Sequence, residues 1–279
     1  MGRTEFHGRT AYLFGGSAGI GLATARQLAA LGAHVVLFAR NAERLERALE
    51  SVRGCRVADD QRFACLAVDV ADRDAVTEVC EWAVAELGPP YLLINSAGRA
   101  LPRPFEEVTH EQFDQTMRIN LYGTWNTVAA LLPRMKAEGQ GHIVNTSSIV
   151  GFVGVFGYTD YAASKFGVLG FSEALRSEVK PHGIRVSVLC PPDTDTPGYQ
   201  TENQTKPEET RAISEKAKVM QADAVAAALI RGIARNRPVI IPGLDGRLTW
   251  LAKRLAPGLV ERIMDRTIAR VRKTRRGDS

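Results

Sequence analysis

A phenol and an ammonium lie four residues apart in the segment Tyr161-Ala-Ala-Ser-Lys165. Residues at this spacing share one face of a helix. An ammonium beside a phenol favours the phenolate, so we expect Lys165 to lower the pKa of Tyr161. A tyrosine tuned in this way gives a proton to a carbonyl oxygen as a hydride reaches the carbonyl carbon. Ser148 ends the preceding predicted strand, where its hydroxyl is placed to bind the same oxygen. The pattern predicts a carbonyl reductase.

A glycine-rich turn follows the first predicted strand and leads directly into a helix. Its glycines are Gly15, Gly19 and Gly21, with Ser17, Ala18 and Ile20 between them. Backbone amides in such a turn approach a pyrophosphate closely, at the positive end of the helix. The spacing G-x-x-x-G-x-G differs from the standard G-x-G-x-x-G fingerprint. The turn predicts a dinucleotide site, and the alternative is a turn that needs glycine only for packing.

The end of the second predicted strand selects between two nicotinamide cofactors. Arg40 stands there, and no carboxylate precedes Glu43. An acidic residue at this point binds the free ribose 2′-hydroxyl of NAD, whereas a guanidinium matches a 2′-phosphate. Arg44 lies one helical turn further and supplies a second cation. These residues favour NADPH, although solvated arginines are the alternative interpretation.

The elements that must position these residues alternate along the chain between short apolar runs and longer amphipathic segments. Strands are predicted at Ala11–Phe14, Val35–Ala39, Phe63–Val68, Tyr91–Asn95, His142–Thr146, Ile184–Leu189 and Val239–Ile241. Helices are predicted at Gly19–Leu31, Ala42–Val52, Arg73–Leu87, His110–Glu138 and Tyr158–Lys180. This order is typical of an α/β fold, a doubly wound, seven-stranded parallel sheet of Rossmann type. Its ligands bind beyond the carboxyl ends of the strands.

Composition excludes several classes of protein. The 279 residues are 45% hydrophobic and 24% charged, which is ordinary globular usage. The four cysteines form no CxxC pair and no zinc-ligand spacing, so we predict no metal site and a reducing compartment. No apolar run is long enough to span a membrane, and the first residues lack a signal-peptide pattern. We therefore expect a cytoplasmic protein.

Positive charge is concentrated at the end of the chain. The net charge is +5, yet residues 246–279 hold ten Lys and Arg against three Asp and Glu. The rest of the chain is slightly acidic, so nucleic acid is not an expected partner. We predict one globular unit over 1–245, with a lid at 191–220 that is rich in proline at its start, and a basic extension over 246–279.

The extension has the pattern of an amphipathic helix. Its apolar stripe consists of Val260, Ile263, Met264, Thr267, Ile268 and Val271, and Arg262, Arg266, Arg270 and Lys273 lie off that stripe. One interpretation is a helix in a membrane interface, with cations on anionic lipid. The other is a helix packed on a partner subunit or over the mouth of the active site. The sequence leaves both open.

Taken together, these motifs resemble the short-chain dehydrogenase/reductase family over about Thr10 to Pro242. The matching elements are the glycine turn, Asp69-Val70, Asn95-Ser-Ala-Gly98, Asn120, Ser147-Ser148, Tyr161 with Lys165, and Pro191 with Thr196. The resemblance implies that 1–245 is an NADP(H)-binding reductase domain. It implies that Tyr161 is the acid/base, that Ser148 polarises the substrate carbonyl, and that Lys165 binds the nicotinamide ribose. It further implies that Asn120 anchors a water next to Lys165. The cofactor contacts implied are Asp69, Val70, Asn95, Ala97, Gly98, Pro191, Thr194 and Thr196.

The lid carries a second, narrower resemblance. Pro191-Pro-Asp-Thr-Asp-Thr-Pro-Gly198, Glu202-Asn203 and Thr205 to Thr210 are similar to the lids of 3-ketodihydrosphingosine reductases. This implies NADPH-dependent reduction of a long-chain 3-keto amine lipid, whose ammonium we expect to meet lid carboxylates among Asp193, Asp195 and Glu202. Reduction of another 3-oxoacyl, steroid or aliphatic ketone is the alternative, and an NADP(H)-binding sensor or scaffold is the non-enzymatic one.

Two further expectations concern the details of the family pattern. Phe14, Ser96 and Pro192 depart from residues that are usual in the family, so we expect an unusual shape for the nicotinamide pocket and the substrate mouth. Apolar-faced helices around Leu121–Leu132 and Val168–Val179 are placed to pair between subunits, as they do in family members. We therefore expect a homodimer or homotetramer.

Overall fold

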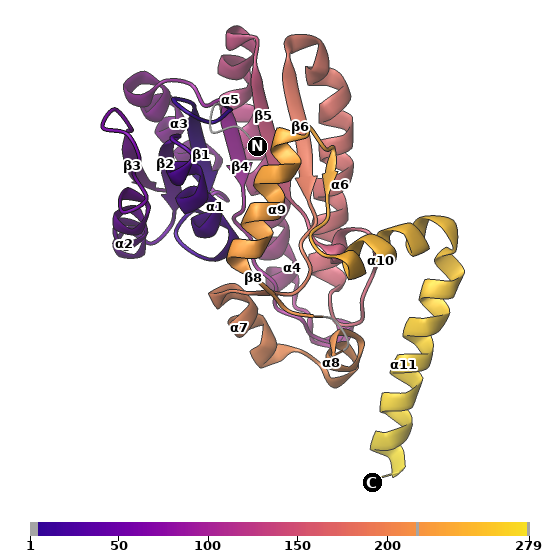
Figure 1. Ribbon diagram of the computed structural model, residues 1–279. Helices are drawn as coiled ribbons and strands as arrows, with labels where there is room; N and C mark the ends of the chain where they lie inside the picture. Colours follow the sequence, from indigo (N-terminus) through magenta and orange to yellow (C-terminus); the bar gives the residue numbers. More distant parts are fainter. Residues whose placement is uncertain (1–4, 216–217, 278–279) are drawn as a thin grey trace.

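A seven-stranded parallel sheet forms the centre of the protein (Figure 1). The computed structural model describes residues 5–215 and 218–277, and the side chains of 275–277 are left out of the description. In sheet order the strands are β3 (Phe63–Ala67), β2 (His34–Ala39), β1 (Thr10–Phe14), β4 (Leu92–Asn95), β5 (Gly141–Thr146), β6 (Ile184–Leu189) and β9 (Val239–Ile240). The strand order reverses between β1 and β4, where such sheets bind ligands. The predicted fold class is confirmed.

Helices cover both faces of the sheet. The helices α1 (Gly19–Ala30), α2 (Ala42–Arg53) and α9 (Ala222–Ala234) pack on one face, and α3 (Arg73–Leu87), α5 (Gly123–Glu138) and α6 (Thr159–Val179) on the other. Successive strand residues alternate between the two cores. Leu13 and Val35 belong to one core, whereas Tyr12 and Val36 belong to the other. Burial on both faces explains why these strands are apolar throughout.

The long helix predicted over 110–138 is interrupted in its middle. Helix α4 (His110–Met117) leads into a π-helical turn, η2 (Arg118–Tyr122), which continues directly into α5. The ends of the segment agree with the sequence pattern, but the change in helical type was not predicted. A π turn often marks a functional site, and this one contains Asn120.

The lid after β6 consists of two short helices held by a small second sheet. Strand β7 (Thr194–Asp195) pairs in parallel with β8 (Met220–Gln221), and α7 (Pro197–Thr205) and α8 (Glu208–Ser214) lie between them in sequence. Thr196 caps α7, because its hydroxyl accepts a hydrogen bond of 3.1 Å from the amide of Tyr199. The start of α7 is therefore fixed by its cap, and the strands on either side of the two helices pair with each other.

Two helices, α10 (Leu244–Leu255) and α11 (Pro257–Gly277), complete the chain. Trp250 packs edge-on against Phe152, with ring centroids 4.7 Å apart. Val260 and Met264 of the predicted stripe pack against the same apolar cluster, and α11 contacts α8 of the lid. This part of the stripe therefore covers the protein body. Among the described helices, none is both long and apolar enough to cross a membrane.

Candidate active site

A cleft of about 690 Å³ opens beyond the carboxyl ends of the central strands, beneath the lid. Most of the residues expected at the site line it. They are Gly15, Ser17, Ala18, Gly19, Ile20, Arg40, Arg44, Asp69, Val70, Ala97, Gly98, Ser148, Tyr161, Lys165, Pro191, Thr194 and Thr196. Gly21, Asn95 and Asn120 do not line the cleft but support its wall.

The glycine turn forms one wall of the cleft. Gly15 and Gly19 have φ of +81° and +52°, a region that favours glycine. A Cβ on Gly15 would lie 2.5 Å from the amide nitrogen of Ala97, so no side chain fits between the two segments. The first turn of α1 has neither an acidic residue nor a side-chain cap. Its amides are thus left for an anion, and the wall fits the pyrophosphate of a dinucleotide.

Two of the residues behind the cleft act through packing and hydrogen bonds. A Cβ on Gly21 would lie 2.3 Å from the carbonyl oxygen of Gly15, so this glycine lets α1 pack tightly on the turn. Asn95 is buried at the end of β4, donates to Oδ1 of Asn145 at 2.9 Å and accepts from Thr127 at 2.7 Å. Both residues therefore hold the strand ends that carry the cleft.

Arg40 and Arg44 lie at the end of the cleft beyond β2. The Arg40 guanidinium is 3.9 Å from Oδ2 of Asp69, and its side chain is 66% exposed. Asn41 caps α2 by accepting a hydrogen bond of 2.7 Å from the amide of Arg44. The cap fixes the start of α2, so that both guanidinium groups line the same end of the cleft.

Tyr161 lies in the first turn of α6, at the floor of the cleft. Burial and the negative charge of Glu202 raise its pKa, whereas a hydrogen bond with Ser148 acts in the opposite direction. The expectation that Lys165 lowers this pKa is therefore wrong for the protein alone, because loss of hydration is the largest influence on the phenol and raises its pKa. A buried phenol with a raised pKa keeps its proton, which is the form that a proton donor requires.

Lys165 is buried beside Tyr161. Its Nζ donates a hydrogen bond of 2.9 Å to the carbonyl oxygen of Thr146 and lies 5.6 Å from the centre of the Tyr161 ring. Burial lowers the pKa of Lys165 to about 8. A Cβ on Gly98 would lie 3.4 Å from this Nζ and 3.3 Å from Oδ1 of Asn120. Gly98 therefore allows the β4 end to approach the ammonium closely.

Asn120 is fully buried, and its side chain makes three hydrogen bonds with two residues. Its Oδ1 accepts from the amide of Arg99 at 2.9 Å, and its Nδ2 donates at 3.0 Å to the carbonyl of Arg99 and to Oγ of Ser164. The π turn supplies the backbone position that brings this side chain to both the β4 end and α6. Asn120 thus joins the two segments on either side of Lys165.

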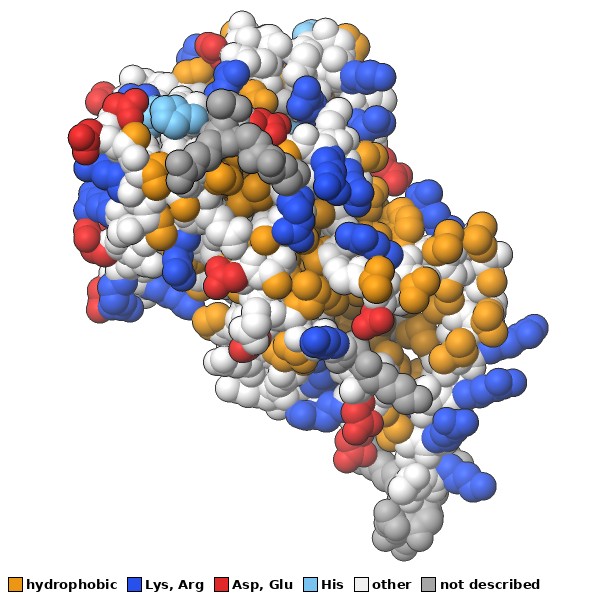
Figure 2. All heavy atoms as spheres, viewed as in Figure 1, with side chains coloured by type: hydrophobic (Ala, Val, Ile, Leu, Met, Phe, Trp, Pro, Cys, Tyr) orange, Lys and Arg blue, Asp and Glu red, His pale blue; other side chains and the backbone are white. Residues whose placement is uncertain are grey.

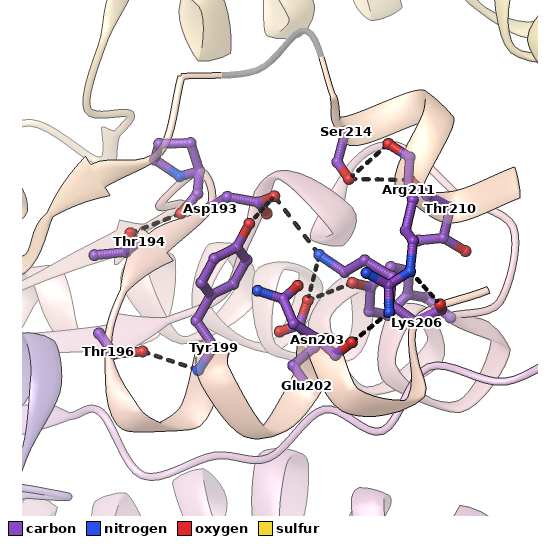
Figure 3. Close-up of polar contacts among 12 residues, drawn as sticks. Asp193, Thr194, Thr196, Tyr199, Glu202, Asn203, Lys206, Thr210, Arg211 and Ser214 are labelled. Atoms are coloured by element: carbon purple, nitrogen blue, oxygen red, sulfur yellow. Dashed lines mark hydrogen bonds and ion pairs between the residues drawn. The ribbon is translucent and has the colours of Figure 1, made fainter. Parts of the chain in front are cut away.

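The lid adds a group of polar residues in which the sequence indicated the carboxylates, but not the lysine and tyrosines that hold them (Figure 3). Lys206 is buried between Glu202 and Asp193, with its Nζ 3.2 Å from Oε1 of Glu202 and 3.7 Å from Oδ2 of Asp193. The Tyr158 hydroxyl donates to Glu202, and the Tyr199 hydroxyl donates to Asp193 at 3.3 Å. The sequence shows the spacing of four between Glu202 and Lys206, which suits a helical ion pair. It does not show that Lys206 also meets Asp193.

Comparisons with known proteins agree with this geometry. The short chain dehydrogenase family profile matches residues 9–207. The chain belongs to this family. A 3-dehydrosphinganine reductase of Danio rerio is 39% identical over 87% of this chain and 73% of its own length. A 3-ketodihydrosphingosine reductase of Bos taurus is 40% identical over 87% of this chain and 74% of its own length. Both resemblances expected from the sequence are confirmed, and the chain is an oxidoreductase.

Solved structures of the family superpose closely on this chain. Levodione reductase aligns with a TM-score of 0.79 at 27% identity, over 88% of this chain and 99% of its own. A short chain dehydrogenase/reductase from Burkholderia phymatum in complex with NAD aligns with a TM-score of 0.79 at 25% identity. The alignment covers 92% of this chain and 95% of that one. The family and this NAD complex support a nicotinamide dinucleotide as the cofactor of the cleft.

Proposed function

We propose that this enzyme reduces 3-ketodihydrosphingosine to dihydrosphingosine with NADPH. The observation that carries the reaction is the meeting of Ser148, Tyr161 and Lys165 on the floor of one cleft, next to an uncapped helix start. The substrate follows from relatives of about 40% identity that are named for it. The carboxylates of the lid fit a substrate that carries an ammonium.

Each of these residues has a task in the reaction. Ser148 and Tyr161 hold the substrate carbonyl oxygen by hydrogen bonds and so polarise the carbonyl group. NADPH, when bound, supplies the hydride that reaches the carbonyl carbon. Tyr161 gives its phenolic proton to the oxygen, which yields the alcohol. Lys165 stabilises the phenolate that is left and binds the nicotinamide ribose, and Asn120 anchors the water through which the proton is replaced.

The remaining contacts of the cofactor follow from the walls of the cleft. The amides from Ser17 to Ile20 and the glycines around them would hold the pyrophosphate. Asp69 and Val70 would contact the adenine, and Ala97 and Gly98 would lie along the cofactor. Arg40 and Arg44 would bind the 2′-phosphate, which is why we propose NADPH in preference to NADH. Pro191, Thr194 and Thr196 of the lid would close over the nicotinamide.

A rate assay with purified protein tests the proposal. We expect consumption of NADPH with 3-ketodihydrosphingosine and formation of dihydrosphingosine in equal amounts. Faster turnover of acyl thioesters, steroids or simple ketones would favour another substrate class within the same reaction. Binding of NADPH without turnover of any ketone would favour a sensor or scaffold. Dihydrosphingosine that forms without loss of NADPH would contradict the proposed reaction.

An exposed apolar face near the C-terminus supports peripheral binding to a membrane. Leu244, Leu248, Leu251 and Leu255 recur on one side of α10 and are 74%, 63%, 52% and 77% exposed. Leu259 and Ile263 extend the patch along α11. Figure 2 shows hydrophobic side chains gathered at this corner and Lys and Arg side chains along the edge beside them. Such a surface fits an interface with anionic lipid, from which a long-chain substrate reaches the cleft.

Sedimentation with vesicles tests this surface. Removal of everything after Asp245 would also remove Trp250 from its contact with Phe152, so point substitutions are the sharper probe. We expect the wild-type protein to bind phosphatidylserine vesicles at low salt, and the triple variant Leu248→Gln, Leu251→Gln, Leu255→Gln to bind much less. High salt should weaken wild-type binding. Loss of self-association in the variant, with no vesicle binding by either protein, would assign the patch to a second copy of the chain.

Self-association through the α5 and α6 side is proposed on separate grounds. Tyr122, Trp125 and Phe166 lie there and are 54%, 45% and 42% exposed. Large exposed apolar groups in one region are typical of contact surfaces. We propose that a homodimer or homotetramer covers them, and that the enzyme acts in the cytoplasm. Sedimentation velocity of the wild-type protein and of Trp125→Lys tests this contact.

The division into a reductase domain over 1–245 and an extension over 246–279 stays a prediction.

A further inference from the structure

The polar cluster of the lid does not balance its own charge. Lys206 is the ammonium at its centre, and the side chain is only 3% exposed. Two carboxylates, Asp193 and Glu202, face it, with 27% and 16% of their side chains exposed. One ammonium neutralises one carboxylate, so the cluster keeps a net negative charge in a largely buried place. An uncompensated charge at such a place is unfavourable, as the raised pKa of the buried Glu202 carboxyl indicates, and a cation that arrives relieves it.

Each carboxylate is held through one of its two oxygens (Figure 3). Oε1 of Glu202 accepts from Tyr158 and lies next to the Lys206 ammonium. Oδ2 of Asp193 accepts from Tyr199 and lies next to the same ammonium. Within residues 5–215 and 218–277, these contacts all fall on Oε1 of Glu202 and Oδ2 of Asp193, and no hydrogen bond of a side chain reaches the other oxygen of either group. The protein thus fixes the position of both groups and leaves one oxygen of each for another donor.

The cluster faces the reacting end of the cleft. Asp193 and Glu202 line the same cleft as Tyr161. The ring of Tyr158, whose hydroxyl holds Glu202, lies 5.6 Å from the ring of Tyr161, centre to centre. The negative charges of both carboxylates also raise the pKa of Tyr161. A cation that binds here lies beside the carbonyl that Tyr161 protonates.

We propose that Glu202, together with Asp193, binds the ammonium of the substrate and so determines specificity for 2-amino ketones. This inference rests on the proposed function, because the substrate named there carries its ammonium on the carbon next to the carbonyl. Lys206 acts as a positioning residue whose ammonium holds one oxygen of each carboxylate and leaves the cluster one cation short. Asp195, the third carboxylate considered from the sequence, is exposed, and its nearest polar partner is Nε2 of Gln221 at 3.5 Å. It takes no part in the site.

The bound ammonium also helps the chemical step. Proton donation leaves a phenolate on Tyr161, and the net negative charge of Glu202 and Asp193 around Lys206 opposes that charge. When the substrate ammonium pairs with Glu202, this opposition is removed. The amine of the substrate therefore raises the turnover number as well as the affinity, an effect that simple packing against the lid would not produce.

Three ketones and one conservative substitution test the inference. The ketones are 3-ketodihydrosphingosine, its N-acetyl derivative, and the same chain with hydrogen in place of the amine. The variant is Glu202→Gln, which keeps the shape and removes the charge. The matched control is Glu208→Gln in α8, an exposed glutamate of the same lid. Thermal unfolding and NADPH affinity are measured for each variant, so that a folding defect is recognised.

We expect the wild-type kcat/KM for the amine to exceed that for the deaminated ketone by about 10- to 100-fold, the size of a charge-assisted hydrogen bond. Glu202→Gln should lose most of this preference, because the amine loses its partner and the deaminated ketone no longer meets an uncompensated negative charge beside the phenolate. Glu208→Gln should behave like the wild type. If Glu202→Gln does not fold, the same kinetic comparison is made with Asp193→Asn, together with the preference of the wild-type enzyme for the amine over the deaminated ketone.

Three results would overturn the inference, and they are distinguishable. If the wild-type enzyme reduces all three ketones equally well, the ammonium is not recognised, although the proposed reductase function stands. If it consumes no NADPH with the amine, the proposed substrate is wrong and the inference falls with it. Equal losses on all three ketones in Glu202→Gln would assign Glu202 to lid structure alone, which also contradicts specificity for the amine.

Discussion

Replacement of Arg40 by alanine should separate the two nicotinamide cofactors. Arg40 and Arg44 line the end of the cleft that would receive the adenosine ribose. NADPH carries a phosphate on that ribose, and NADH does not. A change at Arg40 should therefore weaken the binding of NADPH and leave the binding of NADH almost unaltered.

The size of the effect follows from the exposure of Arg40. A hydrogen bond between charged groups contributes about 1.5–3 kcal/mol. The Arg40 side chain is 66% exposed and lies 3.9 Å from Asp69, so water and salt screen its charge. We therefore expect the lower end, about 1.5 kcal/mol, which is about a tenfold increase in the Kd of NADPH. Removal of Arg44 as well should add a further increase, because Arg44 offers a second cation to the same phosphate.

The assay is a titration of each cofactor followed by protein fluorescence at two salt concentrations. Arg47→Ala is the control, since Arg47 is an exposed arginine of α2 that pairs with Glu43 and does not line the cleft. The wild-type Kd of NADPH should rise with salt more steeply than that of NADH. Equal weakening of both cofactors in Arg40→Ala would refute the assignment, as would equal affinities of the wild-type protein for NADPH and NADH.

Three further predictions concern the proton donor and two buried bases. Tyr161→Phe should lower kcat by about 100-fold or more while the Kd of NADPH stays unchanged, and substantial turnover would remove the role given to this phenol. Lys165, with its pKa lowered to about 8, loses its proton as the pH rises through that value. The kcat/KM for reduction should therefore fall above about pH 8, and a flat profile to pH 10 would contradict this. His142 is buried and hydrogen-bonded to Ser187, and burial lowers its pKa to about 4. Between pH 7 and 5 the His142 imidazole binds a proton in the unfolded chain but not in the folded protein. The free energy of unfolding should therefore fall by about 2 kcal/mol over this range. Urea unfolding of the wild-type protein and of His142→Gln measures this, and an equal pH dependence of both proteins would show that another group is responsible.

Much of the fold and of the catalytic floor follows from local patterns in the sequence. Continuous apolar strands indicate a sheet covered on both faces, because each strand residue meets one core or the other. The spacing of Tyr161 and Lys165 sets both on one side of α6. The glycine turn is readable as well, since glycine readily adopts the positive φ that Gly15 and Gly19 have. These features survive in the structure because they depend on neighbours in the chain.

The tertiary structure decided the environment of those same groups. Burial raises the pKa of Tyr161, which the neighbouring Lys165 alone would lower. Burial depends on what covers a residue, and the lid that covers Tyr161 comes from a distant part of the chain. Tertiary contact also explains why Phe14 stands where the family usually has another residue. Its ring stacks on that of Phe38 in the neighbouring strand, with ring centroids 4.3 Å apart.

The lid and the C-terminal helices show the limit of sequence patterns most clearly. The apolar stripe on α11 indicates that an apolar surface covers it. The helical spacing of these residues does not distinguish lipid, a second subunit and the body of the protein as that surface. The structure places Val260 and Met264 on the body and leaves the leucines of α10 exposed. Lys206 has a partner four residues away and another in a separate segment, Asp193. The sequence by itself determined the sheet, the cofactor turn and the spacing of the catalytic pair. Only the folded chain decided which charges meet in the lid, because electrostatic pairing of buried groups depends on distance in space rather than on separation along the chain.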